Sequence, residues 1–293
     1  MRRASRPLVA IAATMVVVLV AGCERVSQSP PDGDAAAAAI VATADFGARS
    51  LLDVRVAPDQ TVLRALRGAT EVRTEYGGGF VAEMLGRRSD AGARRDWFFW
   101  VDGLLADVGA AERTLADGEE VWWDHHRWDG IRAPLAVVGQ WPAPFAGREV
   151  AADQPLADVV AEAGARLVEG TADWRVRVDD DAELADREKA WARATRDPGP
   201  AGLTARVDGG AVLVQGADGE WSPVPGAGAL AAAVPLGARA ADGVLLAVAG
   251  VDDAAARAAA RTIATRPDVL RLRLSVVFDG DGTPIAHGGR AGT

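Results

Sequence analysis

Cysteine, lysine and histidine are scarce in this sequence. The 293 residues include one cysteine, one lysine (Lys189) and three histidines. A single cysteine excludes an intramolecular disulfide, so packing must stabilise the fold, as is usual in domains above about 100 residues. A formal net charge of -9 without a basic block argues against nucleic-acid binding and against electrostatic docking on anionic lipid. Arginine in place of lysine, with abundant alanine, is typical of a GC-rich genome such as an actinobacterium's.

The sequence also lacks the motifs of common enzyme classes. It has no Gly-x-Ser-x-Gly, no His-Glu-x-x-His, no phosphate loop and no dinucleotide fingerprint. His125 and His126 are neighbours on a predicted strand, so they point to opposite faces and cannot share a metal ion. Asp179–Asp181 is predicted to cap a helix, and Asp279–Gly282 to form a turn. We therefore expect no enzyme activity and no metal site, with an envelope enzyme as a less favoured alternative.

The amino-terminal segment has the pattern of an export signal. Arg2, Arg3 and Arg6 precede an apolar run over residues 8–20, which ends in Ala21-Gly22-Cys23. The run falls short of the ~20 residues that a transmembrane helix needs. The segment resembles a bacterial lipoprotein signal peptide, with an ordinary secretory signal as the alternative. The resemblance implies removal of residues 1–22, lipidation of Cys23 by acyl chains such as palmitate, and anchoring on the extracytoplasmic face of the cell membrane.

After Cys23, a flexible tether is expected over residues 23–39, because this stretch is rich in Ser, Pro and Gly and has no apolar periodicity. Residues 40–140 are predicted to form a β-grasp domain. Strand patterns over 40–46 and 51–56 form a hairpin, a short helix follows at 62–66, and strands are predicted over 72–85, 96–101 and 119–126. Hairpin, helix and then strands is the β-grasp order.

Residues 141–293 are predicted to form a second, small α/β or α+β domain of unknown role. Helical patterns lie at 156–167 and 183–195, and strand patterns at 174–178, 203–207, 211–215, 244–249 and 272–278. Asp252 or Asp253 is predicted to cap a helix that runs through Ile263. The expected fold class of the whole chain is therefore α+β.

Tryptophan is concentrated at the end of the predicted β-grasp domain. Side chains alternate along a strand, so one face of its last strands carries Trp97, Phe99 and Trp123 and is expected to be core. The opposite face is predicted to bind a ligand through Phe98, Trp100, Trp122, Asp124, His126 and Trp128. Burial of this face by the second domain is an equally weighted alternative.

The same region resembles a known family. The resemblance spans roughly residues 40–128, and its motifs are the helix at 60–66, a Trp-led strand ending in Val101-Asp102-Gly103, and Leu115-Ala116-Asp117-Gly118-Glu119-Glu120-Val121-Trp122. These motifs are similar to the transcobalamin C-terminal-like domain of unknown function of bacterial lipoproteins, akin to the cap domain of intrinsic factor. The resemblance implies a β-grasp fold and a cobalamin-like ligand as a candidate.

Two hypotheses follow. The first is a non-enzymatic, membrane-anchored lipoprotein that binds a small molecule, with a corrinoid as a candidate, or docks on a membrane transporter. The second is a structural or interaction lipoprotein whose aromatic face packs on its own second domain or on a partner protein. The sequence alone does not choose between them.

Overall fold

The computed structural model describes residues 37–128, 134–216 and 219–287. The predicted signal peptide, Cys23 and most of the predicted tether lie outside these residues. The described residues form a mixed structure of helices and several sheets, which confirms the α+β class.

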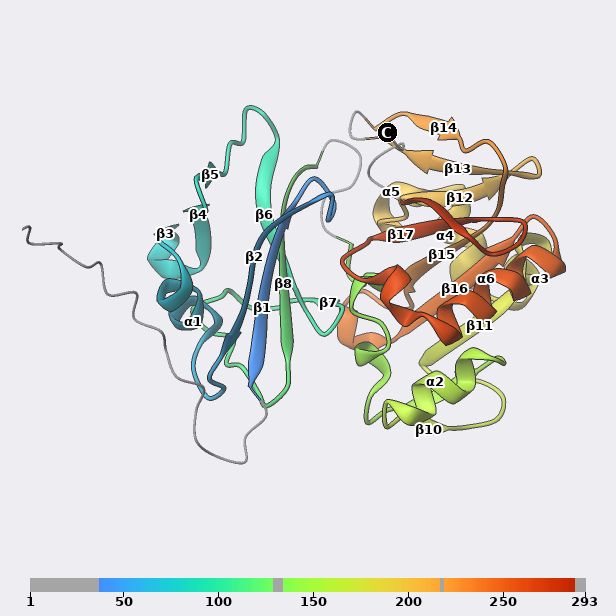
Figure 1. Cartoon of the computed structure of the whole chain (residues 1–293), viewed down its shortest axis with the longest axis horizontal. Coiled ribbons are helices and arrows are strands. Elements are labelled where there is room, and N and C mark those ends of the chain that lie inside the picture. The colour runs from blue at the N-terminus through green and yellow to red at the C-terminus, as the bar shows by residue number, and fades with distance from the viewer. Residues whose placement is uncertain (1–36, 129–133, 217–218, 288–293) are drawn as a thin grey trace, which may run out of the picture. The chain divides into compact units, whose positions relative to one another are not determined.

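The first sheet has five strands in the order β2-β1-β8-β6-β7 (Figure 1). These strands are β1 (Ala38–Ala44), β2 (Arg49–Val56), β6 (Arg95–Val101), β7 (Leu104–Leu105) and β8 (Glu120–Arg127). The central pair, β1 and β8, is parallel, and all the other pairs are antiparallel. With one helix between β2 and β6, this is the β-grasp order. Its first strand begins at Ala38, slightly earlier than predicted. We call residues 38–127 the β-grasp part.

One face of this sheet packs on α1 (Val62–Ala69). The Thr61 side chain accepts a hydrogen bond from the Arg64 N–H and so caps the helix start. The buried helix residues are Val62, Leu63, Ala65 and Leu66, at the spacing that one helix face requires. The cluster that they join includes Trp97, Val121 and Trp123 of the sheet. This is the core face that the sequence pattern predicts.

A small antiparallel sheet lies between α1 and β6 in the sequence. It consists of β3 (Val72–Glu75), β4 (Phe80–Met84) and β5 (Arg87–Arg88), and the short 3-10 helix η1 (Tyr76–Gly78) joins its first two strands. The strand pattern runs over 72–85, and Gly77-Gly78-Gly79 within it predicts a turn or bulge. Gly77 and Gly78 have positive φ and turn the chain back, so the structure has two strands joined by a turn.

The second sheet has seven strands in the order β10-β9-β11-β16-β15-β17-β18. These strands are β9 (Glu149–Ala152), β10 (Arg166–Leu167), β11 (Trp174–Asp180), β15 (Ala227–Pro235), β16 (Val244–Gly250), β17 (Ser275–Asp279) and β18 (Pro284–His287). The pairs from β10 to β16 are parallel, and those from β16 to β18 are antiparallel. We call residues 149–287 the α/β part.

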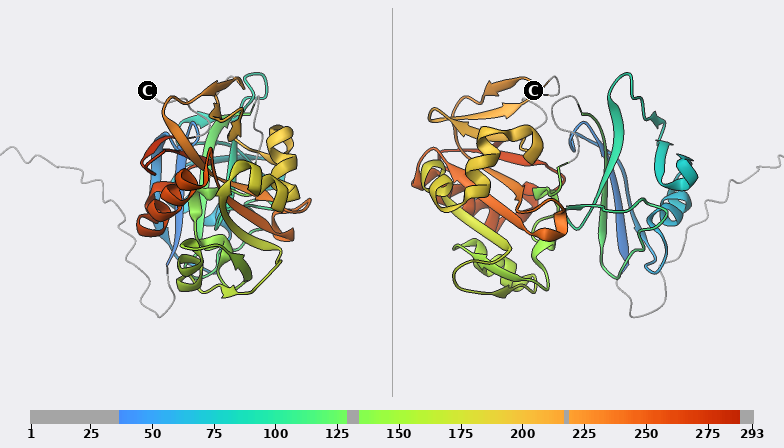
Figure 2. Two further views of the ribbon diagram at one scale, coloured as in Figure 1. Left: turned by 90° about the vertical axis from the view of Figure 1, so that its right-hand side faces the viewer. Right: turned by 180° about the vertical axis from the view of Figure 1, so that it is seen from behind.

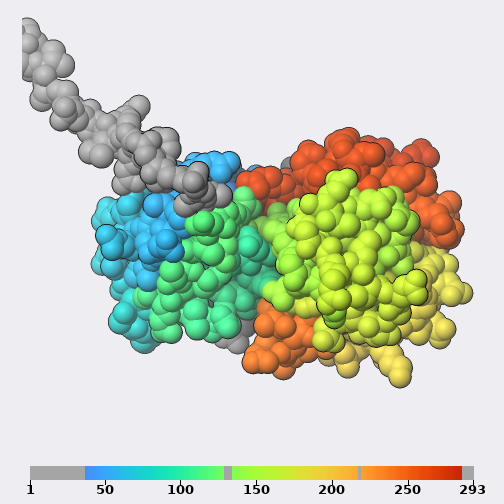
Figure 3. All heavy atoms as spheres, turned by 90° about the horizontal axis from the view of Figure 1, so that it is seen from below, coloured from blue at the N-terminus to red at the C-terminus, as the bar shows by residue number. Residues whose placement is uncertain are grey.

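Both faces of this sheet are covered. The helices α2 (Leu156–Glu162) and α6 (Asp253–Thr265) pack on one face, and Figure 3 shows the yellow-green atoms around α2 against orange-red atoms of the later chain. The other face packs on α3 (Asp181–Arg187) and α4 (Lys189–Arg196), and the left view of Figure 2 shows the sheet between these helices and α6. Every residue of β16 is buried, as its continuous apolar sequence indicates.

The covering layer beside α3 and α4 also contains a second small sheet. Its strands are β12 (Ala205–Asp208), β13 (Ala211–Gln215) and β14 (Trp221–Pro223), and the short helix α5 (Pro198–Ala201) precedes them. One continuous helix is predicted over 183–195, but the structure breaks it at Glu188. The Glu188 carboxylate is buried and accepts hydrogen bonds from Arg175 and Arg177. The first of the two helices is capped by Asp180, as predicted.

Short 3-10 helices connect the larger elements: η2 (Val138–Gln140), η3 (Ala143–Phe145), η4 (Ala240–Asp242) and η5 (Pro267–Leu270). The predicted helix at 156–167 ends at Glu162, and its last residues form β10. Asp252 caps α6 by accepting a hydrogen bond from the Ala255 N–H, as expected. The described residues all belong to one compact unit, so the predicted domain boundary at 140/141 stays a prediction.

Candidate functional site

The predicted ligand face of the β-grasp sheet is largely buried. Trp100, Trp122, Asp124 and His126 each have 0% of their surface exposed. Phe98 and Trp128 are half-buried, and the Trp128 indole donates a hydrogen bond to Asp96 over 2.7 Å. All six side chains lie where the strand alternation predicts, but they do not form an open surface. We call this set the aromatic face.

Two segments cover the aromatic face. The connecting segment, residues 134–140, lies beside β7. The Leu105 N–H donates to the Leu135 carbonyl and the Val137 N–H to the Gly103 carbonyl, each over 2.9 Å. The Trp100 indole donates to the Pro134 carbonyl over 2.8 Å. Residues 271–274 of the α/β part supply Leu274, which packs in one cluster with Phe46, Trp100, Trp122 and Val137.

Polar bonds fasten these segments to the sheet. The Gln140 amide accepts a hydrogen bond from the Gly103 N–H over 2.8 Å and donates to the Glu120 carbonyl over 2.7 Å. Arg271 forms an ion pair with Glu120 at 2.7 Å. Arg273 donates to the Gly47 carbonyl over 2.7 Å. The β-grasp part is therefore fixed to the α/β part by both apolar packing and hydrogen bonds.

Asp124 lies at the centre of a buried polar network on the aromatic face. One carboxylate oxygen accepts from the Phe46 N–H over 3.0 Å and lies 2.8 Å from His126 Nδ1. The other accepts from the Thr43 hydroxyl over 2.5 Å and from the Gly47 N–H over 3.0 Å. Both carboxylate oxygens of Asp124 therefore have hydrogen-bond partners despite their burial, and these bonds hold the turn after β1.

Aromatic rings enclose His126. Its ring stacks against Phe46 with centroids 4.4 Å apart, and against Phe98 at 4.7 Å. Arg273 approaches the same region, where burial lowers the pKa of its guanidinium and the charge of Asp124 opposes that shift. The arrangement resembles a packed interface, in which a histidine is held by a carboxylate and two rings.

The protein's own chain thus covers the aromatic face. This arrangement is the one that the structural hypothesis describes, in which the face packs on another part of the chain. In this conformation a ligand cannot reach Trp100, Trp122, Asp124 or His126. Binding of a ligand by these residues stays a prediction, and it would require residues 134–140 and 271–274 to move away.

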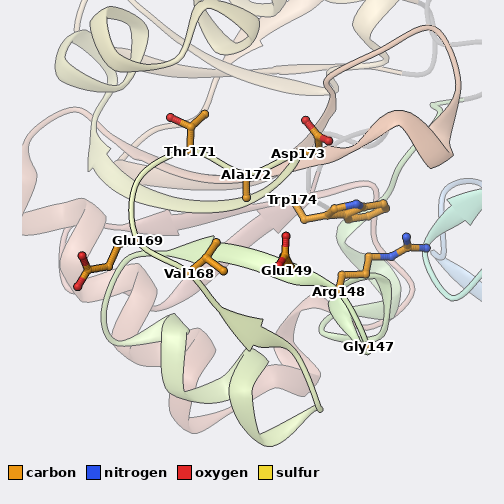
Figure 4. Close-up of a pocket in the computed structure, with 9 residues that line it drawn as sticks. All are labelled: Gly147, Arg148, Glu149, Val168, Glu169, Thr171, Ala172, Asp173 and Trp174. Atoms are coloured by element: carbon orange, nitrogen blue, oxygen red, sulfur yellow. The ribbon is translucent and has the colours of Figure 1, made fainter.

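A separate groove is open to solvent at one end of the seven-stranded sheet (Figure 4). Its volume is about 580 Å³, and it lies between the first residues of β9 and β11 and the chain that follows β10. Its lining residues are Gly147, Arg148, Glu149, Val168, Glu169, Thr171, Ala172, Asp173 and Trp174. We call it the sheet-end groove.

Arg148 and Trp174 contact each other at one side of this groove. The Arg148 guanidinium lies 3.9 Å from the centre of the Trp174 ring, a cation–π contact that Figure 4 shows. Its Nε donates to the Pro144 carbonyl over 3.0 Å. Within the described part of the chain, no carboxylate forms an ion pair with Arg148, and burial lowers the pKa of its guanidinium. A half-buried cation without a counter-ion favours an anionic group beside it.

Carboxylates surround the same groove. Glu149, Glu169 and Asp173 are exposed, and Glu149 forms an ion pair with Arg166. Figure 4 shows Glu169 pointing away from Arg148. The groove therefore offers one cation and several acceptors, which suits a small polar molecule that carries both an anionic group and hydrogen-bond donors.

Little in the sequence indicates this groove. Arg148 and Trp174 are far apart in the chain, and neither belongs to a motif. One weak signal is available: Trp174 begins a strand directly after polar residues, where an aromatic ring at a sheet end can meet a ligand. The pairing of β9 with β11, which brings the two residues together, cannot be read from local patterns.

Metal binding finds no support in the described residues. They contain no group of three or more His, Cys, Asp or Glu side chains placed to hold an ion. His125 and His126 do point to opposite faces: the His125 ring lies 4.9 Å from that of Trp97 on the core face. Nor does any described helix have the length and apolarity to cross a membrane.

One domain family matches part of this chain. Residues 59–127 match a domain of unknown function, DUF4430, within the span of the expected resemblance. No curated protein matches this chain.

Two solved structures are similar to part of the chain. One is a Ruminococcus gnavus ATCC 29149 protein provisionally described as metal binding, with 12% identity and a TM-score of 0.27 over 31% of this chain and 97% of its own. The other is haptocorrin in complex with Cbi, with 15% identity and a TM-score of 0.26 over 35% of this chain and 28% of its own. Likenesses this weak support no argument about function.

Proposed function

We propose that the protein is a non-enzymatic binding lipoprotein, anchored through Cys23 on the extracytoplasmic face of the cell membrane. In this proposal the aromatic face has a structural role, because it fixes the β-grasp part to the α/β part. The small-molecule site is the sheet-end groove. The observation that carries the proposal is Arg148, a half-buried cation with no carboxylate partner among the described residues, beside open space.

The ligand class follows from the groove's chemistry. An anionic group would pair with the free edge of the Arg148 guanidinium, which Trp174 holds in place. Donors on the same ligand would face Asp173 and Glu149 at the rim. Amino acids and short peptides carry both kinds of group, so a zwitterionic small molecule fits better than a simple anion.

Calorimetric titration of the protein with a panel of amino acids, dipeptides and dicarboxylic acids tests this site. We expect at least one zwitterion to bind, and Arg148→Ala to abolish the binding. Arg193→Ala is the matched control, since Arg193 is an arginine on α4, outside the groove. If no zwitterion binds, or if Arg148→Ala binds as the wild type does, the groove is not the site.

Corrinoid capture on the aromatic face is the second candidate, supported by the gathering of Phe98, Trp100 and Trp122 with His126 on one face. It requires the covering segments to open. Titration with cyanocobalamin, followed by tryptophan fluorescence, tests it. A saturable change that Trp122→Phe abolishes would favour this candidate, and no change would leave the face with its structural role.

Anchoring rests on the basic end, the apolar run and the small residues before Cys23. Stable attachment needs two acyl chains, because a single myristoyl-length chain binds membranes only marginally. We expect the wild type to be released from membranes by detergent and not by salt, and Cys23→Ala to lose its lipid. Equal membrane retention of Cys23→Ala would contradict the anchor. A protein anchored in this way could instead dock on a membrane transporter, which is the other form of the binding hypothesis.

A further inference from the structure

The strand β2 is an unusually long open edge for this protein. It has eight residues and ends the five-stranded sheet, pairing only with β1 among the described strands (Figure 1). All the other end strands of the described sheets have two to four residues. Long edges invite pairing with another strand, and proteins usually shorten or block them.

The side chains of β2 form an apolar row on one face and carry charges of both signs on the other. Leu52, Val54 and Val56 share the face that packs towards α1, and each is only half-buried. Asp53 and Arg55 lie on the opposite face and are exposed. Neither forms an ion pair or a side-chain hydrogen bond with any described residue. The edge thus presents an apolar row and one unpaired charge of each sign.

These charges are complementary to a second copy of the same strand. In an antiparallel pair centred on Val54, Asp53 lies opposite Arg55 of the other copy, and the contact occurs twice by symmetry. Centring the pair on Asp53 or on Arg55 instead places like charges opposite each other. Opposite charges directly across an antiparallel pair stabilise it and like charges destabilise it, so one register is selected.

We propose that β2 pairs with β2 of a second copy, in a twofold antiparallel arrangement centred on Val54 that joins the two five-stranded sheets. Leu52 of each copy lies opposite Val56 of the other, so both half-exposed apolar rows are covered. Because the same residues contribute from each side, the contact closes as a dimer and does not propagate. Pairing covers five residues of each strand, residues 52–56, and stops before Pro58.

Disulfide cross-linking of the full chain tests this register, since Cys23 is the only native cysteine. Val54→Cys places two thiols directly opposite each other, at the separation of ~4.5–5.5 Å between Cα atoms that a bridge accepts. We expect a cross-linked dimer on mild oxidation, seen on a non-reducing gel. Ser50→Cys is the control on the same strand: its thiols would lie ~27 Å apart at ~3.4 Å per residue. It should stay monomeric, as should the wild type.

A charge exchange provides the second measurement. Asp53→Arg sets two positive charges against each other at both symmetric contacts with Arg55. It should weaken self-association of the purified full chain in sedimentation about tenfold. The double variant Asp53→Arg/Arg55→Asp restores opposite charges and should recover it. If Val54→Cys unfolds the chain, separately tagged copies with Asp53→Cys and Arg55→Cys, mixed, should cross-link.

Absence of the cross-link in both designs overturns the proposal, as does cross-linking of Ser50→Cys equal to that of Val54→Cys. Failure of the double variant to recover association overturns the register. These results are separate from the proposed anchor and groove, because none of the substituted residues lies in either.

Discussion

The two faces of the five-stranded sheet are both buried, but they are built differently. The face towards α1 is apolar: Trp97, Val121 and Trp123 pack with the helix, and the Trp123 indole N–H is buried without a partner in the described structure. The aromatic face combines rings with hydrogen bonds, and its Trp100 and Trp122 indoles both have acceptors. One face is made within a single β-grasp unit, whereas the other is completed by residues from the α/β part.

The difference suggests what each face can tolerate. An apolar core depends on shape and volume, whereas a polar interface also needs each buried donor and acceptor to keep its partner. The aromatic face is therefore expected to respond to changes in either part of the chain. The predictions below test whether the two faces contribute equally to stability.

The largest expected effect comes from removing the tryptophans. We expect Trp100→Ala and Trp122→Ala to lower the free energy of unfolding by ~3–5 kcal/mol, as much as Trp97→Ala and Trp123→Ala, because all four are buried. Chemical denaturation measures this. Trp221→Ala is the control, because this ring is only half-buried and lies under the Arg206 guanidinium, so its loss should cost only ~0.5–1 kcal/mol.

The opposite outcome is equally informative. If Trp100→Ala and Trp122→Ala keep the wild-type stability, the aromatic face is not permanently covered in solution. The ligand-binding prediction for this face would then regain support.

The β-grasp part could be predicted largely from the sequence because its signals are local. Alternation along β6 and β8 assigns Trp97 and Trp100 to opposite faces, and Thr61 marks the start of α1. The order of hairpin, helix and strands then leaves few topologies. Gly77-Gly78-Gly79 indicates a turn or bulge at this point, and the structure has the turn between β3 and β4 there.

The covering of the aromatic face and the sheet-end groove could not be predicted in the same way. Both depend on packing between distant residues, such as the cluster that includes Trp122 and Leu274, and the Arg148–Trp174 contact. Such pairings follow from how two sheets pack, which single-residue patterns do not encode. The break at Glu188 has a similar origin, since its buried ion pairs come from β11.

Gly139 provides a test of the close contact between the two parts. A Cβ at this position would lie 2.7 Å from the Trp122 ring and 2.6 Å from the Arg273 backbone nitrogen. We expect Gly139→Ala to cost ~1–3 kcal/mol of stability, as overpacking usually does. Gly199→Ala, in α5 with no atom within 4 Å, should instead be neutral or stabilise by ~0.4–1 kcal/mol. Equal thermal stability of the two variants would contradict a tight interface.

His125, on the core face, should make stability depend on pH. Burial lowers the pKa of its imidazole in the folded protein below the ordinary value of 6.5. Between these two pKa values the unfolded chain binds more protons, so the free energy of unfolding falls as the pH drops below about 6.5. His125→Phe should flatten this dependence, measured as unfolding midpoints from pH 7 to pH 5. An unchanged slope would show that other groups cause it.

The smallest effect is expected at the rim of the aromatic face. Glu120 and Arg271 pair at 2.7 Å, with 20% and 46% of their side chains exposed, so solvent weakens the attraction. A double-mutant cycle with Glu120→Gln and Arg271→Gln should give a coupling of ~0.2–1 kcal/mol, decreasing with added salt. The Arg113–Glu119 pair lies within the β-grasp part and is the matched comparison. If the Glu120–Arg271 coupling is as large as that of a buried pair, solvent screens this ion pair less than its exposed fraction indicates. A coupling of zero at low salt would mean that Gln140 and the apolar contacts alone join the two parts.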